Sequence, residues 1–95
     1  MKQKLLERFI RYVKIWTESN EENADKGIMP STEGQWDLAN VLLEELTQLG
    51  LSSCTITKNC YTYGLLKATP GYESVPGFCL LAHIDTSPEV SGKNV

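Results

Sequence analysis

Residues 78–88 have the sequence FCLLAHIDTSP, in which a short apolar run is followed at once by His83 and Asp85. The run from Phe78 to Ala82 is too short for an amphipathic helix and is typical of a strand buried on both faces. Side chains two residues apart on a strand point to the same side. We therefore expect His83 and Asp85 to act together at the end of this strand, where α/β sheets commonly hold their ligands.

The pair of His83 and Asp85 suits a metal site. A neutral imidazole is a good zinc ligand, and a carboxylate that accepts the other ring N–H fixes the tautomer and makes the ligand more basic. In such a site His83 would be the ligand and Asp85 the carboxylate that orients it. It leaves open a second interpretation, in which His83 is an ordinary surface or hydrogen-bonded histidine.

Two helices are predicted before this strand, and the first lies in residues 4–17. The apolar side chains there recur at spacings of one, three and four, and form one stripe with the charged residues outside it. We expect this helix to end near Thr17 and residues 18–30 to form an exposed loop. The stripe consists of Leu5, Leu6, Phe9, Ile10, Val13 and Trp16.

The second helix is predicted to begin at Ser31 or Thr32 and to stop at Gly50, a residue that tolerates positive φ. Thr32 and Gln35 fit a capping box, in which the hydroxyl bonds a free backbone amide and the Gln side chain reaches back. The expected apolar face of this helix consists of Trp36, Ala39, Leu42, Leu43, Leu46 and Leu49.

A hairpin is predicted after the second helix. Residues 52–59 alternate as a strand does and are rich in β-branched side chains. A turn near Lys58 and Asn59 leads into a second strand over about residues 61–68. Residues 70–77 contain Pro and Gly at both ends and are predicted to be a loop. The order helix, helix, strand, strand, strand predicts an α/β fold in layers.

The composition of the 95 residues is that of an ordinary globular protein, with 41% hydrophobic and 22% charged residues and a net charge of −3. A negative chain without a basic patch gives no reason to expect nucleic acid as a partner. No apolar run approaches the ~20 residues that a membrane span needs, and no targeting signal opens the chain. We therefore expect neither nucleic acid nor a membrane as a partner.

The chain has three cysteines, Cys54, Cys60 and Cys79, with no CxxC spacing. An odd number argues against a disulfide framework and fits a reducing cytoplasm. Cys79 lies in an apolar run and is expected to be a buried small hydrophobe. Cys54 and Cys60 could be metal ligands, but no second Cys or His pair completes a tetrahedral set, so a structural role is expected.

Four blocks of the chain, in collinear order, resemble the peptidase T group, a family of dinuclear zinc exopeptidases of the aminoacylase type. The apolar run into His-Ile-Asp-Thr-Ser-Pro, residues 83–88, resembles the group's first metal motif. Residues 30–36, Pro-Ser-Thr-Glu-Gly-Gln-Trp, resemble the start of its second helix, and residues 4–9 resemble its first. Residues 91–95, Ser-Gly-Lys-Asn-Val, resemble the sequence after the motif. The motif alone indicates only the wider superfamily, and the blocks at 30–36 and 91–95 narrow the resemblance to this group.

The resemblance implies a catalytic domain with an α/β sheet, in which two zinc ions share a bridging aspartate and a bridging water. It implies that His83 is the first zinc-ligating histidine and that Asp85 is the catalytic-site carboxylate that orients it. A separate glutamate would be the general base. The implied reaction is metal-assisted hydrolysis of short peptides, typically tripeptides, with release of the N-terminal residue.

The bridging aspartate, the general base and the other ligands that the resemblance implies have no matching motif among these residues. Glu44 and Glu45 offer no substitute, and we expect both to lie on the solvated flank of the second helix. A catalytic zinc ion needs about three protein ligands. We therefore expect residues 1–95 to be an incomplete N-terminal segment of the peptidase catalytic domain, inactive by itself.

Two other interpretations stay open. The first is a relative in the same superfamily with another substrate, either a dipeptidase or an acyl-amino-acid hydrolase. The second is a non-catalytic interaction module that binds a partner through the apolar faces of its helices. Zinc binding separates the second interpretation from the enzymes, because an interaction module has no need of zinc.

Overall fold

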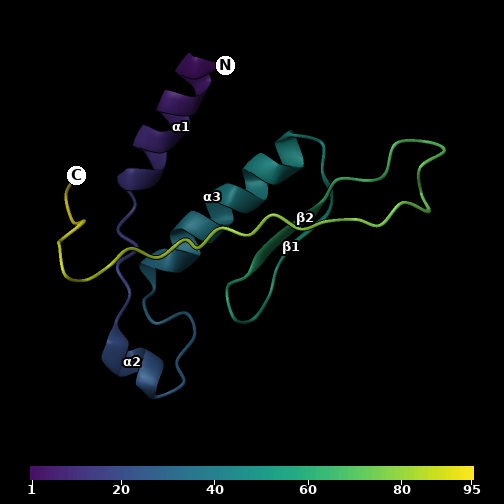
Figure 1. Cartoon of the computed structure of the whole chain (residues 1–95). Helices are drawn as coiled ribbons and strands as arrows, with labels where there is room; N and C mark the ends of the chain where they lie inside the picture. The colour runs from purple at the N-terminus through teal and green to yellow at the C-terminus, as the bar shows by residue number, and fades with distance from the viewer.

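The computed structural model describes all 95 residues, as three helices and a two-stranded sheet. The helices are α1 (Lys2–Val13), α2 (Glu21–Asp25) and α3 (Gly34–Gln48), and the strands are β1 (Ser52–Ile56) and β2 (Thr62–Leu65) (Figure 1). The mixture of helices with a sheet confirms the expected α/β class. The third strand of that prediction is not formed.

The predicted hairpin is confirmed. Strands β1 and β2 pair antiparallel, with Thr55 opposite Tyr63 and Ile56 opposite Thr62. Both strands are shorter than predicted. At the turn they end early because the backbone tightens over residues 57–61, where the Thr57 N–H donates to the Tyr61 carbonyl at 2.8 Å, and β2 also stops at Leu65, opposite Ser52 at the start of β1. The turn falls at Lys58 and Asn59, as the sequence indicated.

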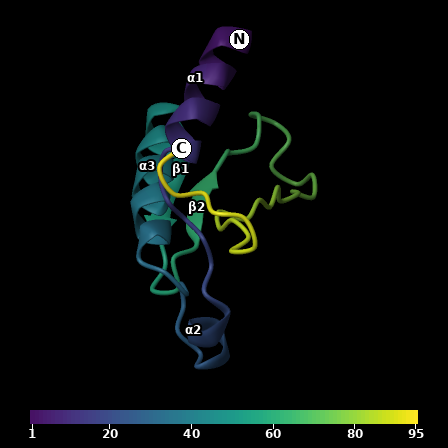
Figure 2. The ribbon, with the colours of Figure 1, turned by 90° about the vertical axis from the view of Figure 1, so that its left-hand side faces the viewer.

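Helix α3 packs along the hairpin and supplies most of the small core. Leu38 and Ala39 of α3 are buried together with Cys60 from the turn of the hairpin. The Thr62 hydroxyl adds a hydrogen bond of 3.4 Å to the Ala39 carbonyl. Figure 2 shows α3 on one side of the hairpin and the loop that follows β2 on the other. The predicted apolar face was therefore correct at Ala39 but left out Leu38.

The start of α3 differs from the predicted capping box. The helix begins at Gly34, and its N-cap residue, Glu33, makes no side-chain capping bond. The Thr32 hydroxyl instead donates to the Glu18 carbonyl at 2.6 Å, and the Gln35 amide donates to the Thr32 hydroxyl at 3.1 Å. Thr32 thus ties α3 to a distant segment: its hydroxyl donates to the Glu18 carbonyl and accepts from the Gln35 side chain, where the capping box would have it accept from a backbone amide.

Helix α1 ends at Val13, and the prediction that it reaches Thr17 is wrong. The Ile15 N–H donates to the Tyr12 carbonyl in a tight turn, and the chain then becomes extended. Thr17 is buried, and its carbonyl accepts a hydrogen bond of 3.1 Å from the Thr86 N–H. This long-range pairing holds Thr17 out of the helix, although the apolar periodicity continues to Trp16.

The expected loop at residues 18–30 contains the short helix α2. Asn20 caps α2, because its side-chain oxygen accepts a hydrogen bond of 2.9 Å from the Asn23 N–H. Five residues are too few for an apolar period to be visible, so the sequence analysis missed this helix.

Helix α1 is held to α3 through the carboxylate of Glu45. Arg11 and Tyr12 both donate hydrogen bonds to this carboxylate, and the Arg8 Nε lies 3.6 Å from it. Only 12% of the Glu45 side chain is exposed, so its expected place on the solvated flank of α3 is wrong. Glu44 is exposed, as expected.

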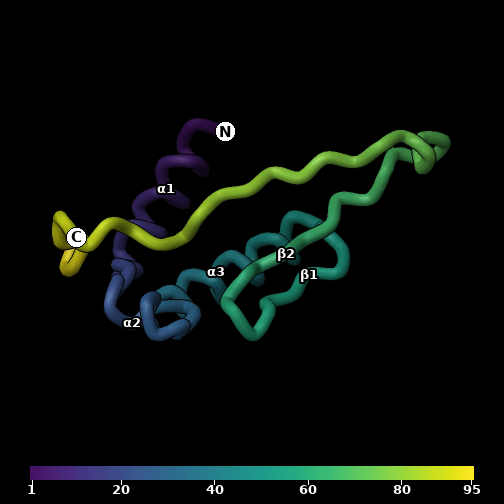
Figure 3. The backbone as a smooth tube through the Cα atoms, turned by 60° about the horizontal axis from the view of Figure 1, so that its bottom comes forward, coloured from purple at the N-terminus to yellow at the C-terminus, as the bar shows by residue number.

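Residues 78–82 are not a buried strand, which corrects the central expectation of the sequence analysis. Phe78, Leu80 and Leu81 are each close to nine-tenths exposed, and residues 78–85 form no backbone–backbone hydrogen bond. A strand needs a neighbour that satisfies its N–H and C=O groups, and no strand lies beside this segment. Figure 3 shows it as a single extended run between the loop after β2 and the C-terminus.

The molecule as a whole is open. Only five residues are buried, and the radius of gyration is 15.6 Å, against about 13 Å for a compact domain of 100 residues. The apolar stripe of α1 contributes to the exposed surface, with Phe9 60% and Leu5 65% exposed. The buried apolar area is therefore small, and the hydrophobic contribution to stability is correspondingly small.

Candidate metal-binding site

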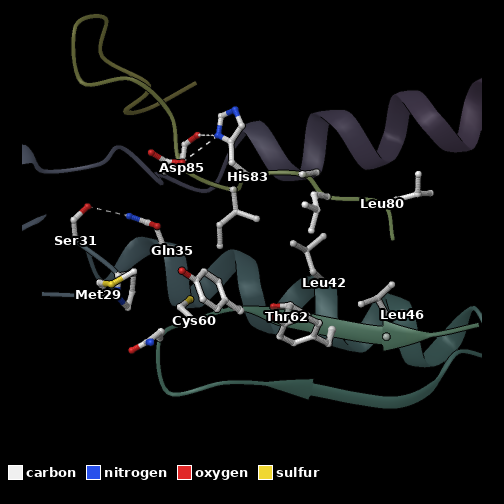
Figure 4. Close-up of a pocket in the computed structure, with 18 of the residues that line it drawn as sticks. Met29, Ser31, Gln35, Leu42, Leu46, Cys60, Thr62, Leu80, His83 and Asp85 are labelled. Atoms are coloured by element: carbon white, nitrogen blue, oxygen red, sulfur yellow. Dashed lines mark hydrogen bonds and ion pairs between the residues drawn. The ribbon is translucent and has the colours of Figure 1, made fainter. Parts of the chain in front are cut away.

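His83 and Asp85 lie side by side on the extended segment, as the sequence predicted from their spacing. The His83 Nδ1 is 2.9 Å from the backbone carbonyl oxygen of Asp85 and 3.1 Å from its Oδ1 (Figure 4). Both side chains point away from Leu42 and Leu46 of α3, toward the outside of the molecule. The alternation of an extended chain thus places them on one side, although the segment is not a strand.

The contacts of His83 fix its tautomer. Both partners of Nδ1 are acceptors, a carbonyl oxygen and a carboxylate oxygen, so Nδ1 must carry the hydrogen. In the neutral ring the lone pair then lies on Nε2, which has no partner in the structure. The His83 side chain is 85% exposed, so Nε2 is accessible. This is the arrangement of a metal-ligating histidine oriented by a carboxylate.

The donor set of the chain fits one ligand of a zinc site and no more. No group of three or more His, Cys, Asp or Glu side chains comes together where an ion could bind. A catalytic zinc ion takes about three protein ligands. His83 would supply one of them, and Asp85 would act on the ion through His83.

The cysteines do not add to the site. All three are free: Cys60 is buried, Cys54 is half-buried and Cys79 is exposed, so the expectation of a buried Cys79 is wrong. Burial raises the pKa of the Cys60 thiol, which favours the neutral form over the thiolate that binds metals. The geometry therefore agrees with a structural role for Cys60.

A cavity of about 690 Å³ lies behind the site, between residues 79–85, α3 and β2. Hydrophobic residues make up 13 of the 21 that line it, including Leu42, Leu46 and Leu81. His83 and Asp85 stand at its outer edge (Figure 4). The cavity thus lies between the extended segment and β2, which do not pair.

The site segment is attached to the rest of the molecule immediately after Asp85. The Thr86 N–H donates to the Thr17 carbonyl at 3.1 Å, and the Ser19 N–H donates to the Thr86 carbonyl at 3.0 Å. The residue between them, Glu18, accepts a hydrogen bond of 2.5 Å from the Gly92 N–H. The sequence analysis missed Glu18, because it lies in a polar stretch with no motif and its partner is distant in the chain.

Comparison with known proteins agrees with the resemblance. No protein-family model matches the chain. All 95 residues align with proteins named peptidase T, with 47% identity to that of Geobacillus thermodenitrificans, 45% to one of Bacillus cereus and 42% to that of Listeria welshimeri. The chain spans 22% of the length of each of these relatives.

An identity of 42–47% over all 95 residues makes the chain a homologue of part of these proteins, which are named as peptidases. Within that class its relatives are peptidase T, so the resemblance seen in the sequence is confirmed. The chain has no helix with both the length and the apolar character needed to cross a membrane.

Proposed function

We propose that the protein to which this chain belongs is a zinc-dependent aminopeptidase that releases the N-terminal residue from short peptides, typically tripeptides. The observation that supports this most directly is the His83–Asp85 pair, with Nδ1 held by two acceptors and Nε2 free. The names of the relatives support a peptide substrate. Residues 1–95 would be the N-terminal segment of the catalytic domain, in a cytoplasmic enzyme.

In this proposal His83 offers Nε2 to one of two zinc ions, and Asp85 holds the ring in the orientation and tautomer that binding needs. Zinc supplies polarisation of the scissile carbonyl and a lowered pKa of the attacking water. The remaining ligands and the general base would come from residues beyond these 95. The chain by itself, with a single ligand, would therefore be inactive.

The exposed apolar surface favours a second candidate function, a non-catalytic interaction module. Phe78, Leu80 and Leu81 on the extended segment and Phe9 on α1 offer apolar area to a partner. Such a module needs no metal, so metal content separates the two functions.

The first measurement is the intact mass of the natural gene product, followed by its zinc content. We expect a longer chain that contains zinc, and loss of part of that zinc and of peptidase activity in His83→Ala. Glu89→Gln is the matched control, because this exposed carboxylate close to Asp85 in the sequence makes no side-chain hydrogen bond or ion pair. A natural chain that ends at Val95, or a His83→Ala variant with unchanged zinc and activity, would overturn the proposal.

A further inference from the structure

The segment that carries His83 and Asp85 depends on a small number of contacts for its position. No backbone–backbone hydrogen bond holds residues 78–85. The first attachment is at Thr86, which pairs in parallel with the extended chain at Glu18. The Ser19 hydroxyl adds a bond of 3.3 Å to the Thr86 carbonyl. The direction in which His83 points is therefore set largely at this pairing.

The Glu18 side chain extends the pairing toward the end of the loop. Its carboxylate accepts the Gly92 N–H at 2.5 Å and so closes the loop of residues 86–92 onto the strand-like residues 17–19. The ammonium of Lys93 lies 5.0 Å from the centre of the Trp16 ring, which adds a cation–π contact at the same place. Residues 16–19 thus hold both ends of the loop: Thr17 and Ser19 bond Thr86 at its start, and Glu18 bonds Gly92 at its end.

The charge of Glu18 suits this role. The pKa of its carboxyl lies below the usual value, mainly because the Gly92 N–H stabilises the carboxylate, with smaller contributions from the side chains of Trp16 and Ser91 and from the charge of Lys93. An ionised acceptor forms a stronger bond to a backbone N–H than a neutral one does. At neutral pH the loop is therefore held by a charge-assisted hydrogen bond.

The other side of Glu18 is fixed to the helical part of the molecule. Its backbone carbonyl accepts the Thr32 hydroxyl at 2.6 Å, and Thr32 in turn accepts the amide of the buried Gln35 in α3. Glu18 therefore joins α3 through its main chain and the 86–92 loop through its side chain. Together with the backbone bonds of Thr17 and Ser19 to Thr86, it connects the helical part of the molecule to the segment that carries His83.

We propose that Glu18 is a positioning residue, whose carboxylate holds the 86–92 loop so that His83 and Asp85 face the zinc site. The role rests on the proposed function, since it needs His83 to be a ligand. Glu18 does not touch the metal or the substrate. Its loss would release the Gly92 end of the loop. The backbone bonds of Thr86 to Thr17 and Ser19 would remain, so the segment that carries His83 would be held less firmly but not set free.

The test compares Glu18→Ala, Glu18→Gln and the control Glu21→Ala in the natural gene product. Zinc affinity is measured by competition with a chromophoric chelator, and ligand geometry by the visible spectrum of the cobalt-substituted protein. Partners that orient a ligand are worth 10–100-fold in metal affinity, and Glu18 acts on His83 only through the loop that it holds at Gly92, so we expect a loss of at most about 10-fold in Glu18→Ala. Glu18→Gln keeps an acceptor oxygen and should recover most of that loss.

The outcomes separate this inference from the proposed function. The exposed Glu21 makes no side-chain contact, so Glu21→Ala should keep both the affinity and the spectrum. If His83→Ala weakens zinc binding but Glu18→Ala leaves affinity and spectrum unchanged, the positioning role is wrong and the metal site stands. If His83→Ala has no effect, both fail. If Glu18→Ala does not fold, Glu18→Gln decides the matter. A partial loss of zinc affinity with a changed cobalt spectrum supports the role of the carboxylate, and an affinity and a spectrum equal to those of the wild type overturn it.

Discussion

Gly34 lies against the backbone of Trp16 so closely that a Cβ at Gly34 would stand 1.8 Å from the Trp16 carbonyl oxygen. Gly34 opens α3, and Trp16 leads directly into the residues that hold the site segment. The absence of a side chain at Gly34 thus allows the helix to meet the extended chain. Only glycine permits this distance without moving one of the two backbones.

We expect Gly34→Ala to destabilise the protein, although alanine is the better helix former by about 1 kcal/mol. The collision is with backbone, which cannot move aside as a flexible side chain does, and overpacking of this kind costs about 1–3 kcal/mol or more. Denaturant unfolding of the natural gene product measures the effect. Gly77→Ala is the control, because a Cβ there meets no atom within 4 Å, and it should change stability by less than about 0.5 kcal/mol. A stabilised Gly34→Ala would contradict the close approach.

The orientation of His83 leads to a second prediction, on Asp85. Substitutions of carboxylates that orient a metal-ligating histidine typically cost 10–100-fold in metal affinity. The backbone carbonyl of Asp85 also accepts the Nδ1 hydrogen and survives any substitution, so we expect a loss of about 10-fold in Asp85→Ala, at the low end of that range. Asp85→Asn keeps a side-chain acceptor and should lose less.

Zinc competition measures both variants, with Glu89→Gln as the control from the same loop. A loss in Asp85→Ala as large as in His83→Ala would mean that Asp85 is itself a ligand, contrary to the geometry. If Asp85→Ala, Asp85→Asn and Glu89→Gln all bind zinc with equal affinity, Asp85 does not orient His83.

A third prediction concerns Glu45, which joins α1 to α3. Its carboxylate accepts from Arg11 and Tyr12, and Glu45→Ala would leave the Arg8 Nε, which already has no hydrogen-bond partner, without its nearby charge. Hydrogen bonds to charged groups are worth about 1.5–3 kcal/mol, and the partial exposure of the arginines reduces this, so we expect a loss of about 1–2 kcal/mol.

Glu44→Ala is the matched control for this prediction, because the neighbouring Glu44 is exposed and contacts only Gln48 of the same helix, at 3.3 Å. It should leave the free energy of unfolding unchanged to within about 0.5 kcal/mol. If Glu45→Ala and Glu44→Ala change the free energy of unfolding by the same amount, Glu45 does not hold α1 to α3.

The parts of the fold that local patterns determine were predictable from the sequence. The 3.6-residue period located α3, and alternation with a turn at Lys58 and Asn59 located the hairpin. The spacing of His83 and Asp85 correctly placed their side chains on one side of the chain. Each of these three features depends on residues that are close together in the sequence, and a sequence pattern can therefore predict it.

The rest depends on contacts between distant residues. Thr17 left the predicted helix because it pairs with Thr86, and the Glu45 side chain is largely buried because α1 contacts α3 there. The apolar run before His83 indicates a buried segment, yet its side chains are exposed. Burial of this run needs another segment packed against it, and a local sequence pattern does not show whether one is present. Glu18 was missed for the same reason, since its partner Gly92 lies at the other end of the chain.

The last prediction is the pH dependence that Glu18 brings to stability. The pKa of its carboxyl is lowered in the folded protein from a usual value of 4.5, mainly by the Gly92 N–H. The folded state therefore binds the proton less readily than the unfolded state does. The stability that the charged form contributes is complete above the usual pKa and is lost as the pH falls through the lowered one.

Unfolding measured at about pH 6 and about pH 3 should show this loss in the wild type, and the loss should be smaller in Glu18→Gln, which carries no titrating group at this position. Glu21→Gln removes a carboxylate that makes no side-chain contact and should follow the wild-type profile. If Glu18→Gln and the wild type lose equal stability on acidification, the Glu18 carboxylate is not bonded to the loop in solution, and the attachment of the site segment must depend on the Thr86 pairing alone.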